Sequence, residues 1–311
     1  MPTVGLIGLG LIGRAWANVF SRAGWEVRGW DPDAAASAKA PELIAQSLRD
    51  VARYGLAKDS AEAARRVKVV GSLDEAVKGA ELVIESGPER IEVKIDLFQR
   101  LDAAAEPGTI LASSSSAIIT SRFTEKLKGR SRCLVAHPVN PPHVVPIVEL
   151  SGAAWTAPET IERAKAIYAG VGQVPIVVKK EIDGFILNRM QAVLLSEAMR
   201  LVGEGFVEAE DLDKTIRDGL GLRWSFMGPF ETIELNAPGG IPDYCARFGA
   251  VFAGLASKPV TPELWGKENI ARAVASWGRS PSPQQILDKQ RWRDERLAAL
   301  VAHKRSQPQS Q

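Results

Sequence analysis

The chain contains few of the residues that form disulfides or bind metal ions. Of its 311 residues only two are cysteine and three are histidine. Cys133 and Cys245 lie far apart and fit no metal-ligand spacing. We therefore expect two buried, reduced thiols, no disulfide framework and no bound metal.

Long apolar runs and an excess of one charge are also absent. The apolar runs are short and interrupted by glycine or charged residues, which excludes a membrane-spanning helix. The N-terminus enters an apolar segment within three residues, so we expect no cleavable signal and a cytoplasmic protein. A formal net charge of +2 does not indicate the basic surface that binding of nucleic acid requires. We therefore expect a small-molecule partner, with no nucleic acid and no membrane.

The chain is long enough for two domains, and its pattern changes near residue 184. Over residues 1–183 short apolar strands alternate with helical segments, which predicts an α/β fold with a Rossmann-type, doubly wound sheet. Over residues 184–311 only helical spacing remains, which predicts an all-helical C-terminal domain. Beyond the first two strands, we expect strands at 67–71, 81–85, 109–112, 133–136, 147–150 and 174–178, and helices at 35–54, 72–78, 91–105, 158–170, 186–204, 208–220 and 283–304.

Residues 4–31 form a complete nucleotide-binding βαβ pattern. An apolar strand leads into a glycine-rich turn, a helix follows, and a second strand comes next. Gly8 permits the tight turn, Gly10 lets the backbone approach a pyrophosphate, and Gly13 lets the helix pack close to the strands. The N–H groups of Leu11 and Ile12 then begin a helix whose positive end favours phosphate.

The second strand ends at an acidic residue, and this residue indicates whether the domain binds NAD or NADP. Asp31 lies 18 residues beyond Gly13, where a carboxylate accepts hydrogen bonds from the adenosine ribose and repels a 2′-phosphate. No arginine follows directly. The pattern therefore predicts NAD as cofactor and the first domain as its binding domain.

Two of the three histidines flank a proline-rich segment that follows a predicted strand. His137 and His143 lie at its ends, at the edge of the sheet where doubly wound folds bind ligands. An imidazole there can act as a general base. Glu149 lies in an otherwise apolar strand, where a carboxylate is costly without a partner, and pairing with His137 would remove that cost. The alternative is a purely structural histidine.

Other polar side chains lie where they can reach the same crevice. Serines 113–116 end the strand that begins near Thr109, and Asn188 begins the first long helix of the second domain. A polar turn and a local helix cap are the alternative interpretations of these residues.

With these motifs in this order, the chain resembles the 3-hydroxyacyl-CoA dehydrogenase superfamily over nearly its whole length. The resemblance implies an NAD-dependent dehydrogenase that acts on a CH–OH group. It implies a catalytic set of Ser116, His137, Glu149 and Asn188, with Ser115 as the alternative serine. It also implies that Glu89 and Lys94 bind the cofactor beside the nicotinamide.

Residues 218–237 and 290–296 are similar to the branch that contains lambda-crystallin and L-gulonate 3-dehydrogenase. His-Pro-Val-Asn-Pro-Pro stands here where fatty-acid enzymes usually have His-Phe-Phe-Asn-Pro, which disfavours an acyl-CoA. The resemblance implies oxidation of the 3-hydroxyl of a small hydroxy acid, first of all L-gulonate to 3-dehydro-L-gulonate. It also implies a homodimer through the helical domain. Open alternatives are a short 3-hydroxyacyl-CoA such as 3-hydroxybutyryl-CoA, another β-hydroxy acid such as carnitine, and a non-catalytic NAD-binding or structural protein.

A small acid substrate requires one cationic anchor and several hydrogen-bond partners. Arg223, beside Trp224 in a glycine-rich stretch, is our candidate for the anchor, although an exposed arginine is more often simply solvated. Ser116, Asn140 and Asn188 are the candidates for contacts with the substrate hydroxyls.

Overall fold

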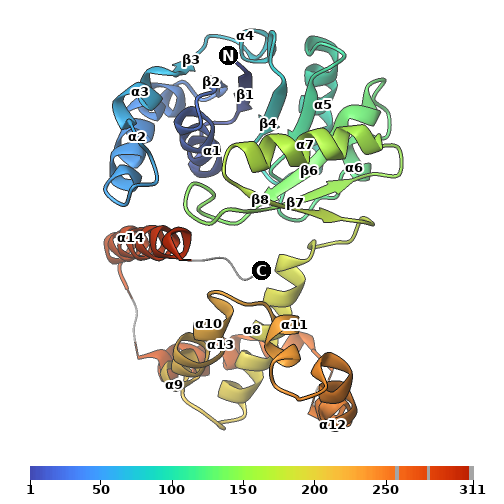
Figure 1. The fold of residues 1–311 in the computed structure, drawn as a ribbon. Helices are drawn as coiled ribbons and strands as arrows, with labels where there is room; N and C mark the ends of the chain where they lie inside the picture. Colours follow the sequence, from blue (N-terminus) through green and yellow to red (C-terminus); the bar gives the residue numbers. More distant parts are fainter. Residues whose placement is uncertain (256–258, 279–280, 308–311) are drawn as a thin grey trace. The chain divides into compact units, whose positions relative to one another are not determined.

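The computed structural model describes residues 1–255, 259–278 and 281–307 and divides the chain into two compact units (Figure 1). The first unit comprises Met1–Asn188 together with Asp288–Gln311, and the second comprises Arg189–Leu287. The last helix, α14 (Pro283–Ser306), therefore has most of its length in the first unit, although its sequence follows the helical region.

The first unit is built on an eight-stranded sheet with the order β3-β2-β1-β4-β5-β6-β7-β8. The first six strands are parallel, and β7 and β8 run the other way because β6 pairs with β7 antiparallel. The strands are β1 (Thr3–Ile7), β2 (Glu26–Trp30), β3 (Val67–Val69), β4 (Leu82–Glu85), β5 (Ile110–Ser113), β6 (Cys133–Pro138), β7 (Ile147–Gly152) and β8 (Val174–Val178). The predicted Rossmann-type sheet is confirmed, with strand ends within two residues of those expected.

Helices cover the sheet on both faces. They are α1 (Leu11–Arg22), α2 (Ala34–Ala52), α3 (Ser60–Arg65), α4 (Leu73–Val77), α5 (Ile91–Ala104), α6 (Ser121–Thr124) and α7 (Pro158–Gly170). Local chemistry fixes several starts: the side chains of Asp33, Asp59 and Ser72 accept hydrogen bonds at the starts of α2, α3 and α4. The short helices α3 and α6 were not predicted, because so few residues carry little periodic signal.

Two separate cores hold these helices against the sheet. On one face Trp16 of α1 packs against Tyr168 of α7, with 5.4 Å between ring centroids, and both side chains are fully buried. On the other face Phe98 of α5 packs against Phe123 of α6 at 4.6 Å. Burial on both faces makes the central strands β1, β4 and β5 almost continuously apolar, as expected for a parallel sheet, whereas β2 and β3 are partly buried and carry charged residues.

A third, smaller hydrophobic cluster attaches α14 to the first unit. Val51 of α2 and Val144 of the β6–β7 loop pack there with Ala298 of α14, and all three are buried. On the same loop the carbonyl of His143 accepts a hydrogen bond of 2.8 Å from the Arg22 guanidinium. The C-terminal helix is thus part of the core of the nucleotide-binding unit.

The regular elements described in the second unit are all helical, as predicted. They are α8 (Leu187–Gly203), which starts in the first unit, α9 (Ala209–Lys214), a π-helical segment (Thr215–Leu220), α10 (Gly221–Trp224), α11 (Pro229–Glu234), α12 (Gly240–Leu255), a 3-10 segment (Pro262–Trp265) and α13 (Lys267–Trp277). None of the described helices combines the length and apolar character needed to cross a membrane.

The expectation of two buried thiols was half wrong. Cys133 is buried in β6, but Cys245 is exposed. Cys245 belongs to α12, which is apolar yet buries none of its residues. An apolar helix in the sequence therefore did not imply a buried one.

His143 should make the stability of the first unit depend on pH. Burial, and then the charges of Arg22 and Arg293, lower its pKa to about 4. The unfolded chain takes up a proton near pH 6.5, so between these values the unfolded state binds more protons and stability falls as the pH drops. The expected loss between about pH 7 and 5 is about 2 kcal/mol.

His143→Gln cannot take up this proton and should remove that loss. Denaturant unfolding at the two pH values measures it, with the exposed His303→Gln as the matched control. An unchanged pH dependence in His143→Gln would contradict the assignment.

Candidate active site

The glycine-rich turn between β1 and α1 leaves an open, positively polarised helix start. Gly8 has a φ of +95°, which favours glycine. A Cβ on Gly13 would lie 1.8 Å from the carbonyl oxygen of Gly8, so a larger residue would push α1 away from β1. Gly10 is the N-cap of α1 without a side-chain cap, and no atom lies within 4 Å of its Cβ position. The N–H groups of Leu11 and Ile12 are thus available to a diphosphate.

Asp31 is fixed at the tip of β2, next to this turn. Its carboxylate accepts hydrogen bonds from the backbone N–H groups of Leu9 at 2.6 Å and Asp33 at 2.8 Å. The Arg14 guanidinium donates to the carbonyl of Leu9 at 2.8 Å. The turn and the acid are therefore held together, and both fit an NAD diphosphate and adenosine ribose.

His137 and Glu149 form a buried pair across two strands. They lie opposite each other in the antiparallel register of β6 and β7, and His137 Nδ1 lies 2.8 Å from Glu149 Oε2. His137 is 4% exposed and Glu149 is 0% exposed. The separation of twelve residues in sequence is thus a direct cross-strand contact in the fold.

Hydrogen bonds keep Glu149 ionised in spite of its burial. Burial by itself would raise its pKa, but the hydrogen bond with His137 and those from the N–H groups of Leu187 and Ile186 lower the pKa below its usual value. These N–H groups lie 3.0 and 2.9 Å from Glu149 Oε1. An ionised Glu149 favours a proton on His137 Nδ1, which leaves Nε2 free to act as a base.

Phe185 supports the imidazole, and sequence reasoning missed it. Its ring centroid lies 5.1 Å from that of His137, and its side chain is fully buried. It follows Gly184 in the turn that leads to Asn188, and its φ is +50°. An aromatic residue just before a candidate site residue was the available signal, but nothing in the sequence indicates which ring it contacts.

The two candidate serines have different surroundings. Ser115 is buried, and its hydroxyl donates a hydrogen bond to Glu89. Ser116 is exposed, and its carbonyl accepts a 2.9 Å hydrogen bond from Asn188 Nδ2. Ser116 and Asn188 are therefore adjacent, and of the two serines Ser116 has the accessible hydroxyl.

A buried ion pair supports the loop that carries these serines. Lys94 Nζ lies 2.9 Å from Glu85 Oε2 and 3.7 Å from Glu89 Oε2. The hydroxyl of Ser113 donates to Glu85 Oε2 at 2.6 Å. Lys94 is 1% exposed, so it points into the protein, while Glu89 is exposed. Glu85 was not predicted, although an acid ending an apolar strand is the same signal that singled out Glu149.

The two remaining candidates are Asn140 and Arg223. Asn140 is exposed in the loop after β6 and precedes a cis peptide bond to Pro141. Arg223 lies in α10 of the second unit, and its place relative to the pair of His137 and Glu149 stays a prediction. Within the part of the chain that the structure describes, no three His, Cys, Asp or Glu side chains are grouped as metal ligands.

Comparisons with known proteins agree with this geometry. Residues 3–182 match the NAD binding domain of 3-hydroxyacyl-CoA dehydrogenase, and residues 184–274 match the C-terminal domain of 3-hydroxyacyl-CoA dehydrogenase. Lambda-crystallin of Oryctolagus cuniculus is 38% identical, over 98% of this chain and 97% of that protein. L-carnitine dehydrogenase of a Pseudomonas species is 36% identical, over 97% and 93%.

A solved structure resembles the chain over nearly its full length. It is an NAD⁺-dependent 5-dehydrogenase of 5-formyl-3-hydroxy-2-methylpyridine 4-carboxylic acid. The TM-score is 0.84 at 27% identity, covering 99% of this chain and 100% of that one.

The dinucleotide turn and these relatives, several of them dehydrogenases, establish NAD as the cofactor and a CH–OH group as the target. By its two matching domains, which together span most of its length, the chain belongs to the 3-hydroxyacyl-CoA dehydrogenase family, in the branch of lambda-crystallin.

Proposed function

We propose that this enzyme oxidises the 3-hydroxyl of a small hydroxy acid, with L-gulonate as the first candidate and 3-dehydro-L-gulonate as its product. The observation that best supports an oxidation reaction is the buried pair of His137 and Glu149 at the edge of the sheet. Binding of NAD alone would not require such a pair.

In the proposed reaction His137 acts as the general base. Bound NAD supplies the hydride acceptor. His137 Nε2 takes the proton of the substrate hydroxyl, and the carboxylate of Glu149 stabilises the imidazolium through Nδ1–H. Ser116 and Asn188, which contact each other, hold the substrate oxygen as it changes from hydroxyl to carbonyl.

Two points support a small acid. The relatives include an L-carnitine dehydrogenase, named for an acid whose hydroxyl lies β to its carboxylate. The segment after His137 is Pro-Val-Asn-Pro-Pro, which departs from the pattern of the fatty-acid enzymes. A short 3-hydroxyacyl-CoA and a non-catalytic NAD-binding or structural role are the alternatives that the experiments below separate.

We also propose that the protein is a homodimer through its second unit. Large apolar side chains there are exposed in the single chain, namely Phe206, Phe226, Phe230, Phe248, Phe252, Leu255 and Trp265. Apolar surface of this kind marks an interaction site. Light scattering on the purified protein gives the mass, and a monomer at every concentration would contradict the proposal.

Replacement of either member of the pair should slow the reaction without loss of cofactor. His137→Ala removes the base, and Glu149→Gln removes the charge that orients and stabilises the imidazole. Each should lower kcat by a factor of about 10² to 10⁴. NADH fluorescence titration should give an affinity close to that of the wild type, because neither residue belongs to the dinucleotide turn.

The control for Glu149→Gln is Glu92→Gln, at an exposed glutamate of α5. It should keep full turnover. Full turnover by His137→Ala would refute the assignment of the base.

The substrate class can be tested through Arg223. NADH absorbance should rise with L-gulonate and NAD, and Arg223→Ala should raise the KM for this free acid by about tenfold or more, because a charge-assisted hydrogen bond is lost. Acetoacetyl-CoA, assayed in the reverse direction, has no free carboxylate at its acyl end, and its reduction should change less. Reduction of acetoacetyl-CoA with no turnover of L-gulonate, 3-hydroxybutyrate or carnitine would move the enzyme to the acyl-CoA class. NADH binding without any turnover would favour the non-catalytic role.

A further inference from the structure

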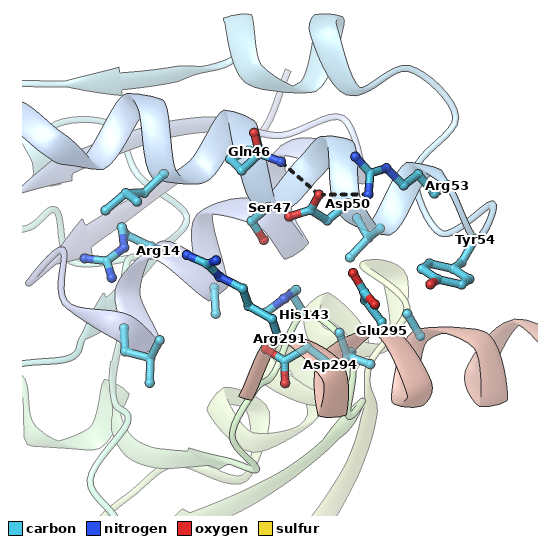
Figure 2. A pocket seen from close by; sticks show the side chains of 16 residues that line it. Arg14, Gln46, Ser47, Asp50, Arg53, Tyr54, His143, Arg291, Asp294 and Glu295 are labelled. Carbon is cyan, nitrogen blue, oxygen red and sulfur yellow. Dashed lines mark hydrogen bonds and ion pairs between the residues drawn. The ribbon is translucent and has the colours of Figure 1, made fainter. Parts of the chain in front are cut away.

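A cavity with both polar and apolar lining lies in the first unit, away from the catalytic pair. It has a volume of about 560 Å³ and is lined by residues of α1, α2, the β6–β7 loop and α14 (Figure 2). Neither His137 nor Glu149 lines it, although Leu11 and Arg14 at the start of α1 do, so it borders the dinucleotide turn. Figure 2 shows Gln46, Ser47 and Asp50 on the α2 side and Arg291 and Glu295 on the α14 side. The volume lies in the range of small-ligand sites.

Some charges of the cavity are already paired. Asp50 accepts a 2.8 Å hydrogen bond from Gln46 and lies 3.8 Å from Arg53. Asp294 forms a 2.7 Å ion pair with its neighbour Arg293. These groups neutralise each other within the wall, so we expect them to contribute little to the binding of a ligand.

Two charged residues on the α14 side of the cavity differ from these. Among the residues that the structure describes, Arg291 and Glu295 have neither an ion-pair partner nor a side-chain hydrogen bond. They lie four residues apart, so they occupy the same face of α14. The α14 wall therefore presents one cationic and one anionic group, and Arg14 of α1, which donates to the carbonyl of Leu9, is a further guanidinium of the lining.

His143 adds a neutral polar group to the same space. Its Nδ1 atom is buried and has no hydrogen-bond partner. Burial and the charge of Arg22 lower its pKa to about 4, so the ring is uncharged near neutral pH. Buried polar atoms are almost always hydrogen-bonded, so an orphan atom in a residue that lines the cavity indicates a further partner, either a water or a ligand.

We propose that this cavity binds a small organic acid that carries hydroxyl or ammonium groups beside its carboxylate. The guanidinium of Arg291 binds the carboxylate, for which its planar fork is well matched. Glu295 accepts hydrogen bonds from hydroxyl groups or attracts the positive charge of an ammonium group, and His143 provides a further polar contact. A simple fatty acid would satisfy Arg291 and leave Glu295 unpaired.

Such a ligand would also hold α14 in place. Apart from the cluster around Ala298, α14 faces α2 across the cavity, so an acid bound there would bridge the two helices. A ligand that binds only the docked form stabilises it by mass action. The inference concerns binding and does not require that the enzyme turn the same acid over.

Hydrogen–deuterium exchange on the full-length protein without NAD tests the inference. The probes are L-gulonate and L-carnitine, with sorbitol at the same concentration as the uncharged polyol. Either acid should slow exchange in peptides from 43–54 and 288–298, and sorbitol should not. Protection by L-gulonate alone would assign hydroxyl groups to Glu295, and protection by L-carnitine alone would assign a charge contact between Glu295 and its trimethylammonium group, which has no N–H to donate.

Arg291→Ala should abolish this protection and weaken binding of the acid by about tenfold or more in calorimetry. Arg296→Ala is the matched control, since Arg296 stacks on Trp292 at 5.4 Å and does not line the cavity. Circular dichroism verifies that both variants fold. Protection that persists in Arg291→Ala, or that is confined to peptides around 113–118 and 137–149, would overturn the inference. The enzyme could also show protection that depends on Arg291 and yet never oxidise L-gulonate. That result would support binding at this cavity and would refute only the proposed reaction.

Discussion

The antiparallel pairing of β6 with β7 is the constraint on which the catalytic arrangement depends. It places the carboxyl end of β6 beside the first residues of β7, so that His137 and Glu149 become direct neighbours. The second oxygen of Glu149 then accepts the backbone N–H groups at the start of α8. One carboxylate thus orients the base and fixes the point where the chain leaves the sheet.

Two buried carboxylates at the carboxyl edge of the sheet have comparable tasks. Glu149 accepts a hydrogen bond from the imidazole of His137. Glu85 accepts hydrogen bonds from the ammonium group of Lys94 and the hydroxyl of Ser113. Each would be costly if unpaired, because charge is poorly solvated inside a protein. These two fully buried strand carboxylates each have a specific partner.

Much of this could be predicted from the sequence because it is encoded locally. The glycine spacing, the acid at Asp31 and the apolar strands each depend on neighbouring residues, and the strand ends agree within two residues. The contact of His137 with Glu149 was predicted because a lone acid in an apolar strand requires a partner. The ring of Phe185 and the partner of Lys94 are contacts between distant segments, and no local pattern specifies them.

The position of α14 shows the same limit and has a consequence for how the protein forms. Helical periodicity predicted this helix but not the surface on which it packs, and it joins Val51 and Val144 in the first unit. On a ribosome those apolar side chains emerge long before their partner, since all of Arg189–Leu287 must be synthesised first. The nucleotide-binding unit therefore completes its third hydrophobic cluster only after Arg189–Leu287 has been synthesised, and until then Val51 and Val144 lack a packing partner on α14.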